Sequence, residues 1–280
     1  MDIEMQLPFD VDKSNPIFAR LGFQTGFLIS NFPLTAKQKD EIFELLGIKV
    51  CERLVSCYEI YSKLQSELNE ANETKNLFSE LNFKYTPNVK ELRIMCEDFL
   101  YQAKSTLRDL LKIYKIFYNE DFSEAHYDEA YKWAKKKFGE KDDLYRMLKK
   151  DNDTWIKKFI FMRNAVEHPN GWHKLTINNI KEIDRGESSY FKAPTWQLDN
   201  EKESPILADM EVFIENALVL SENSLVSLLK KLPGMDIPLL FVEIPEDERN
   251  ANCPVRFQTE LHPDYFIDVR GGIKIKKREC

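Results

Sequence analysis

Apolar residues recur every three or four positions over most of the chain, and this period predicts amphipathic helices. Four long helices are expected, at about 35–69, 89–118, 141–168 and 204–232, with a shorter one at about 125–138. None of them can bury its apolar stripe alone, so they are expected to share one core. The pattern therefore predicts a mainly α protein, built as an antiparallel bundle of four or five helices.

Capping and helix-breaking residues mark the ends of these expected helices. Thr35 is a natural N-cap for the first helix, and Gly47 is a point where that helix can be interrupted. Pro87 can occupy the first turn of the second helix, and Ser204-Pro205 opens the last. Pro169-Asn170-Gly171 stops the helix before it sharply.

Three segments lack the helical period. We expect residues 1–34 to form an irregular N-terminal arm packed on the body, with or without a short strand or helix, because they carry prolines between apolar clusters. Residues 172–203 read as a small β-rich insertion of short strands or extended segments. Residues 233–280 alternate strand-like runs with polar turns, which predicts a small β-like C-terminal extension. The expected domain is then a helical bundle over 35–232 that carries the insertion.

Composition narrows the class of protein. The chain is 43% hydrophobic and 31% charged, with a net charge of −7, so its whole surface is not expected to attract nucleic acid or acidic membranes. The N-terminus has no signal-peptide pattern, and apolar runs such as 237–242 are too short to span a bilayer. Five cysteines without metal-like spacing predict reduced thiols. We therefore expect a cytoplasmic protein without membrane association, metal or other cofactor.

The best candidate site lies where the helix at 141–168 ends, in the run Arg163-Asn164-Ala-Val-Glu167-His168. A helix C-terminus stabilises a histidinium by about 0.3–1 kcal/mol, which favours a His168 side chain that both takes and gives a proton. Arg163 offers a planar, permanently charged fork for a phosphate. Asn164 and His168 are four positions apart and share a helix face. Such a set favours metal-free cleavage of a phosphodiester.

These residues resemble the motif of the HEPN superfamily, in which an arginine and a polar residue precede a histidine on a helix of a four- or five-helix bundle. The resemblance implies a metal-independent endoribonuclease, in which the RNA 2′-hydroxyl attacks the adjacent phosphate. It implies that Arg163 binds and polarises the phosphate, that His168 is general base or acid, and that Asn164 orients the site. It further implies a homodimer with facing motifs, RNA as substrate, and in many members a toxin, with an antitoxin or regulatory protein, or an antiviral defence role.

Simpler interpretations stand beside this one. Arg163 and Glu167 have the spacing of an ordinary helix salt bridge, and His168 that of a capping histidine. Lys157 and Lys158 belong to a basic stretch that either follows an RNA backbone or is a solvated helix face. His173 either lines the same cleft or is an exposed loop residue. The alternative function is a catalytically silent helical module that binds a protein or nucleic acid.

Overall fold

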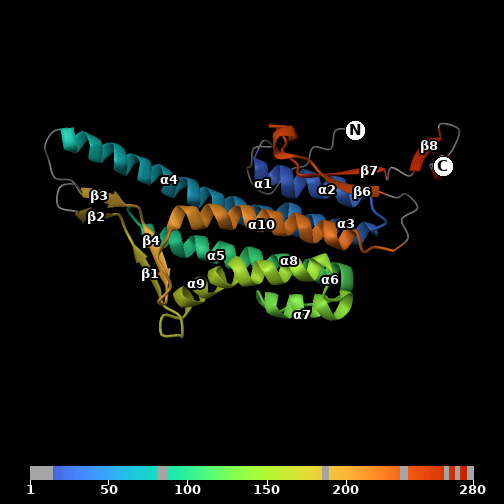
Figure 1. Ribbon diagram of the computed structural model, residues 1–280, viewed down its shortest axis with the longest axis horizontal. Helices are drawn as coiled ribbons and strands as arrows, with labels where there is room; N and C mark the ends of the chain where they lie inside the picture. The colour runs from blue at the N-terminus through green and yellow to red at the C-terminus, as the bar shows by residue number, and fades with distance from the viewer. Residues whose placement is uncertain are drawn as a thin grey trace. The chain divides into compact units, whose positions relative to one another are not determined.

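The structure is a computed structural model that describes residues 15–80, 87–184, 189–233, 239–261, 265–268 and 272–275. The chain is mainly helical, as expected (Figure 1). It divides into two compact units. The first unit comprises Met1–Cys51, Lys112–Asp121 and Leu218–Cys280, and the second comprises Glu52–Leu111 and Phe122–Ala217. These boundaries differ from the expected ones at 34 and 232, because each unit is assembled from separate stretches of chain.

Most of the second unit is helical, and most of its helices lie close to their expected positions. The helix expected at 35–69 differs, because it continues to Glu80. The helix expected at 89–118 is broken at Lys112, and the one expected at 141–168 contains a short π-helical turn at Asn152–Ile156. The helices are α4 (Cys51–Glu80), α5 (Leu92–Leu111), α7 (Tyr127–Phe138), α8 (Asp143–Asp151), α9 (Lys157–Glu167) and the first half of α10 (Ile206–Leu229).

An aromatic cluster forms the core of the second unit and holds α9 in place. Phe159 of α9 lies 4.7 Å from Phe213 of α10 and 6.4 Å from Phe99 of α5, measured between ring centroids. Trp155 meets Phe213 edge to face at 5.7 Å, and Trp196 meets Phe159 at 6.2 Å. Such pairs stabilise beyond the area that they bury. The inner face of α9 therefore packs against α5, α10 and the segment that carries Trp196.

Residues 172–203 form short strands, as the sequence predicted. β1 (Leu175–Asn178) pairs antiparallel with β4 (Thr195–Leu198), which pairs with β5 (Ser204–Pro205). β2 (Lys181–Asp184) and β3 (Ser189–Lys192) form a separate hairpin. Both β1 and β4 contact α9. The insertion thus packs beside the helix that carries the candidate motif.

The N-terminal arm is helical rather than irregular where the structure describes it. α1 (Pro16–Phe18), a π-helical turn and α2 (Gln24–Ser30) continue one another, whereas residues 1–14 lie outside the described part. Asn15 caps the first turn, since its side chain accepts a hydrogen bond from the backbone N–H of Ile17 at 2.9 Å. The expected irregular conformation was wrong here, and the alternative of a short helix was right, because Pro16 starts a helix rather than breaking one.

The rest of the first unit is helical with small strand pairs. A capped helix, α3 (Ala36–Ile42), runs into a π-helical stretch at Phe43–Val50 that contains Gly47, where an interruption was expected. A hairpin of the C-terminal extension contacts α2, and a second strand pair follows it, so the expected β-like character is confirmed. The remaining elements are α6 (Ile113–Tyr118), the second half of α10, β6 (Leu239–Glu243), a 3-10 turn (Glu246–Glu248), β7 (Phe257–Leu261), β8 (Tyr265–Asp268) and β9 (Gly272–Ile275).

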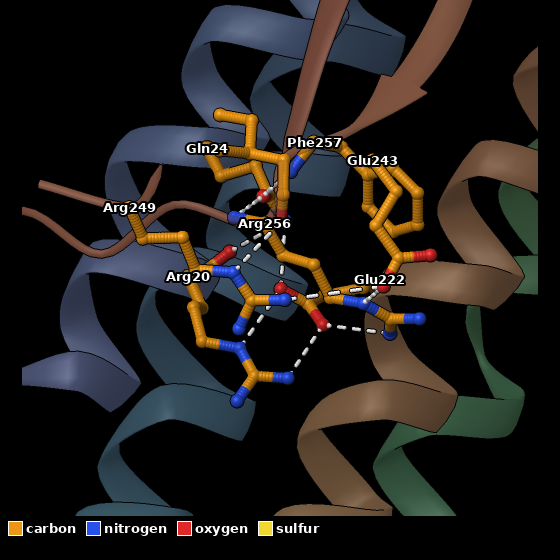
Figure 2. Close-up of polar contacts among 8 residues, drawn as sticks. Arg20, Gln24, Glu222, Glu243, Arg249, Arg256 and Phe257 are labelled. Atoms are coloured by element: carbon orange, nitrogen blue, oxygen red, sulfur yellow. Dashed lines mark hydrogen bonds and ion pairs between the residues drawn. The ribbon is translucent and has the colours of Figure 1, made fainter. Parts of the chain in front are cut away.

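A buried ionic cluster ties that hairpin to the helices of the first unit (Figure 2). Glu222 of α10 accepts hydrogen bonds from Arg20 Nε at 3.0 Å and Arg20 Nη2 at 2.7 Å. Gln24 donates to Glu222 at 2.9 Å and accepts from the backbone N–H groups of Arg256 and Phe257, each at 2.6 Å. A buried carboxylate is tolerated only when its oxygens are paired in this way. The cluster therefore secures the hairpin in one register.

Within the described residues, α10 is the one helix that is long and apolar enough to cross a membrane by length and composition. Inside the structure, 67% of its most apolar window is buried. A core helix of a soluble protein passes the same test, so this finding carries no weight for a membrane span.

Candidate functional site

The candidate motif lies at the C-terminal end of α9. The helix ends at Glu167, and His168 is its C-cap, with φ −124° and ψ 73°. The backbone N–H of His168 still donates to the carbonyl of Asn164 at 2.8 Å. The sequence placed His168 one residue too far inside the helix. Pro169 explains the early end, because the residue before a proline is disfavoured in the helical region.

Arg163 lies against α5, and only 15% of its side chain is exposed. Its Nη1 is 3.6 Å from a carboxylate oxygen of Glu167, and its guanidinium carbon lies 5.6 Å from the ring centroid of Tyr101. The expected helix salt bridge between Arg163 and Glu167 is therefore present. A pair of this length and spacing contributes about 0.2–0.5 kcal/mol, so another anion can displace Glu167 at small cost.

Lys104 of α5 adds a second cation to the motif. Its Nζ donates to Asn164 Oδ1 at 3.0 Å and lies 3.4 Å from a carboxylate oxygen of Glu167. Its side chain is 22% exposed. The sequence offered no signal for this residue, because 60 positions separate Lys104 from Asn164. The motif is thus a cluster from two helices, in which Lys104 and Arg163 both contact the same oxygen, Oε2, of Glu167.

The charges in this cluster act mainly on Glu167. Burial by itself would raise the pKa of the Glu167 carboxyl, but the nearby charges of Arg163 and Lys104 outweigh it. The pKa therefore lies below the ordinary value for glutamate, and Glu167 is ionised at neutral pH. A carboxylate held in this state neutralises part of the two cations and keeps them together.

His168 stands apart from Arg163. The His168 side chain is exposed, and in the described part of the chain no contact joins it to Arg163. Five positions correspond to about 140° around an α-helix, so the two side chains leave α9 in different directions. The structure thus brings Asn164, Lys104, Glu167 and Arg163 together. His168 lies exposed at the helix end, where its charge adds to the causes that lower the pKa of Glu167.

The other three predicted site residues lie around α9. Lys158 Nζ donates hydrogen bonds to Asp209 at 2.6 Å and to Ser204 Oγ at 3.2 Å, so its ammonium group is already paired within the fold. The Lys157 ammonium lies 5.9 Å from the ring centroid of Phe161 and is exposed. Of the two neighbouring lysines, the exposed one is therefore available to a ligand and the other has a structural role.

His173 is part of the surface beside this helix end. Its ring stacks on Phe161 with centroids 4.3 Å apart, and its Nδ1 is 2.7 Å from Asp199. The hydrogen bond from His173 is the main reason that the pKa of Asp199 is lowered, and a second hydrogen bond from the Lys174 backbone adds to it. His173 is therefore an anchored residue rather than a loosely exposed one.

Metal ligands do not gather at this helix end. Across the ranges that the structure describes, no group of three or more His, Cys, Asp or Glu side chains has a geometry that can hold a metal ion. Chemically, the cluster offers two cations, a carboxamide and the Glu167 carboxylate, and the exposed imidazole of His168 lies outside it at the helix end. The cations and the carboxamide suit an anionic substrate such as a phosphodiester.

Comparison of the chain with models of protein families, with curated proteins and with solved structures found no match. The resemblance to the HEPN superfamily therefore stands on the motif alone.

Proposed function

We propose that the protein is a metal-independent endoribonuclease of the HEPN type, working through Arg163 and His168. The observation that carries this proposal is the exposed imidazole at the end of α9, one turn from a cluster that holds Arg163, Asn164 and Lys104. An exposed titratable group beside permanent cations is what phosphodiester cleavage without a metal needs.

The reaction proposed is an internal transfer within RNA. His168 accepts the proton of the 2′-hydroxyl as its oxygen forms a bond to the neighbouring phosphorus. The bond between phosphorus and the 5′ oxygen breaks, and an imidazolium donates a proton to that oxygen. The products are a 2′,3′-cyclic phosphate and a 5′-hydroxyl. Arg163 and Lys104 stabilise the negative charge that grows on the phosphate oxygens.

One protomer holds only half of this machinery. A single His168 cannot act as base and acid in the same step, so we propose a homodimer in which the partner's His168 supplies the second role. Docking of RNA exchanges the weak Arg163–Glu167 contact for a phosphate contact. An antiparallel helical bundle, a cytoplasmic location and control by an antitoxin or regulatory protein belong to the same proposal.

The second candidate is a catalytically silent helical module that binds a protein or nucleic-acid partner. It is favoured by the position of Arg163, whose side chain is 15% exposed and already contacts Glu167 and Tyr101. In this case Arg163 and Lys104 are structural cations that hold α5 against α9.

A cleavage assay separates the two candidates. The protein is incubated with structured RNA in excess chelator, and the ends of the products are identified. The nuclease is expected to leave cyclic phosphate ends, and His168→Ala and Arg163→Ala are each expected to reduce the rate by at least about 100-fold. Cleavage that persists in both variants contradicts the proposal, as does the absence of cleavage by the unsubstituted protein.

Two matched variants control for unspecific effects. His126 is another exposed histidine, at the start of α7, and His126→Ala is expected to cleave normally. Arg93 forms an i,i+4 ion pair with Glu97 on α5 at 2.8 Å, the same kind of contact as that of Arg163. Arg93→Ala therefore reproduces the loss of a helix salt bridge without touching the motif.

A further inference from the structure

Trp172 is the most exposed large hydrophobic residue that the structure describes. Its relative exposure is 101%, whereas Trp155 and Trp196 are buried at 7% and 0%. Leaving an indole in water forgoes the stabilisation that burial of a large aromatic side chain brings. Trp172 lies four residues after His168, between the end of α9 and the start of β1.

The backbone that carries Trp172 is held on both sides. Before it, the N–H of Gly171 donates to the carbonyl of His168 at 2.8 Å. After it, His173 stacks on Phe161 and pairs with Asp199, and Asp199 also accepts from the N–H of Lys174 at 2.7 Å. The indole is thus presented from a fixed turn, which lowers the entropy cost of binding a flat partner.

The surroundings of the indole are polar and carry cations. His168, Asn170 and Lys174 are exposed in the same turn, and Lys157 is exposed on the outer face of α9. The nearby carboxylates of Asp199 and Glu167 are each paired with a basic side chain. A protein-binding hot spot usually lies within an apolar patch. A lone aromatic face among cations instead matches a nucleobase with its phosphates.

We propose that Trp172 is a stacking platform for an unpaired RNA base next to the phosphate held at the motif. This inference rests on the proposed function, because it takes the same RNA as ligand, and it narrows the substrate class to single-stranded or looped RNA. Bases in a duplex already stack on their neighbours, so a side chain at the surface cannot stack on them in the same way. The exposed Lys157 and Lys174 are placed to attract the flanking backbone.

Binding is measured apart from cleavage to test this. In a His168→Ala background, the dissociation constant for a fluorescently labelled single-stranded RNA is determined by anisotropy. Adding Trp172→Ala is expected to weaken binding by about ten-fold, and Trp172→Phe to retain most of it. Replacing the stacked base by an abasic nucleotide is expected to weaken binding to the protein that retains Trp172 by about the same factor. The same replacement should change the dissociation constant of the Trp172→Ala protein little. Tyr58→Ala removes a half-exposed aromatic ring on α4 and serves as the matched control.

The possible results separate this inference from the proposed function. Equal binding with and without the indole, or an indole effect of the same size on duplex RNA, overturns the stacking platform. Cleavage that depends on His168 then still supports the nuclease. Binding that depends on Trp172, in a protein that cleaves no RNA, supports the platform and overturns the nuclease. Absence of any RNA binding overturns the platform.

Discussion

At the residue scale, some members of the motif could be predicted from the sequence, and others were found only in the structure. Arg163, Asn164 and His168 are close in sequence, so their order alone indicated a site. Lys104 joins them only through packing of α5 against α9. His168 and Arg163, in turn, leave the helix in different directions. The sequence motif therefore identified several of the chemical groups. Their positions relative to one another could be known only from the folded structure.

Lys104 provides a test at this scale. Lys104→Met removes one of the two cations beside Asn164 and is expected to slow RNA cleavage by at least about ten-fold. Lys104→Arg keeps the charge and is expected to retain more activity. The free energy of unfolding should change by less than about 1 kcal/mol, because the ion pair with Glu167 is long and partly exposed.

Initial rates and urea unfolding of the same preparations check this prediction. Lys63→Met, an exposed lysine on α4, is the control and should change neither quantity. Full activity in Lys104→Met would mean that Lys104 is only a structural neighbour of Asn164.

At the element scale, the local signals that start helices were reliable. Thr35 forms a capping box with Gln38: its hydroxyl accepts from the backbone N–H of Gln38 at 3.2 Å, and the Gln38 side chain accepts from the Thr35 N–H at 3.1 Å. The arm before Thr35 was misread, since prolines that start a helix and prolines that break one look alike in sequence.

The capping box predicts a measurable loss of stability. Thr35→Ala removes the hydroxyl that accepts from the backbone N–H of Gln38 and donates to the Gln38 side chain. The substitution is expected to lower the free energy of unfolding by about 1 kcal/mol. Thr35→Ser should retain most of it. The midpoint of urea unfolding followed by circular dichroism checks this. Lys37→Ala, a largely exposed neighbour, should shift the midpoint little; an equal shift in both variants would argue against the cap.

The hairpin of β6 and β7 predicts a dependence of stability on pH. The Arg256 guanidinium, whose Nε lies 2.7 Å from Glu243, holds the pKa of that carboxyl below its usual range despite partial burial. Stability from this pair is therefore present above the ordinary glutamate pKa of about 4.3 and is lost as the pH falls through the lowered value in the folded protein.

Glu243→Gln removes this contribution. The difference in unfolding free energy between the two proteins should be largest near neutral pH and should shrink towards about pH 3.5. Urea unfolding across that range measures it. Glu260, on the paired strand, accepts a hydrogen bond from the Gln258 side chain at 2.9 Å rather than from an arginine, so Glu260→Gln should follow the unsubstituted protein. A difference that grows in acid would contradict the assignment.

At the scale of the whole molecule, the active form proposed is a dimer with composite sites. An equal mixture of the unsubstituted protein and His168→Ala contains, after subunit exchange, about half mixed dimers and about a quarter unsubstituted dimers. The mixed dimers hold one intact His168, so they lack either the base or the acid of the proposed step.

The mixture is therefore expected to cleave RNA at about half the rate of the unsubstituted protein before exchange and at about a quarter after it. Cleavage rates before and after exchange, with sedimentation to follow the oligomeric state, check this prediction. A rate that stays at about half after exchange, in a sample that is dimeric, would place each site within a single protomer. A monomer at all concentrations would contradict the dimer itself.

The sequence by itself determined that the chain is mainly helical and marked several helix ends, such as those at Thr35 and Pro169, because periodicity, caps and prolines act within a few residues of one another. It also established the chemical groups of the motif. Only the tertiary structure decided that Lys104 reaches Asn164 across 60 positions and that Arg20 meets Glu222 across 202. The physical reason is that such contacts depend on how buried faces pack together, and packing of distant segments leaves no local pattern in the chain.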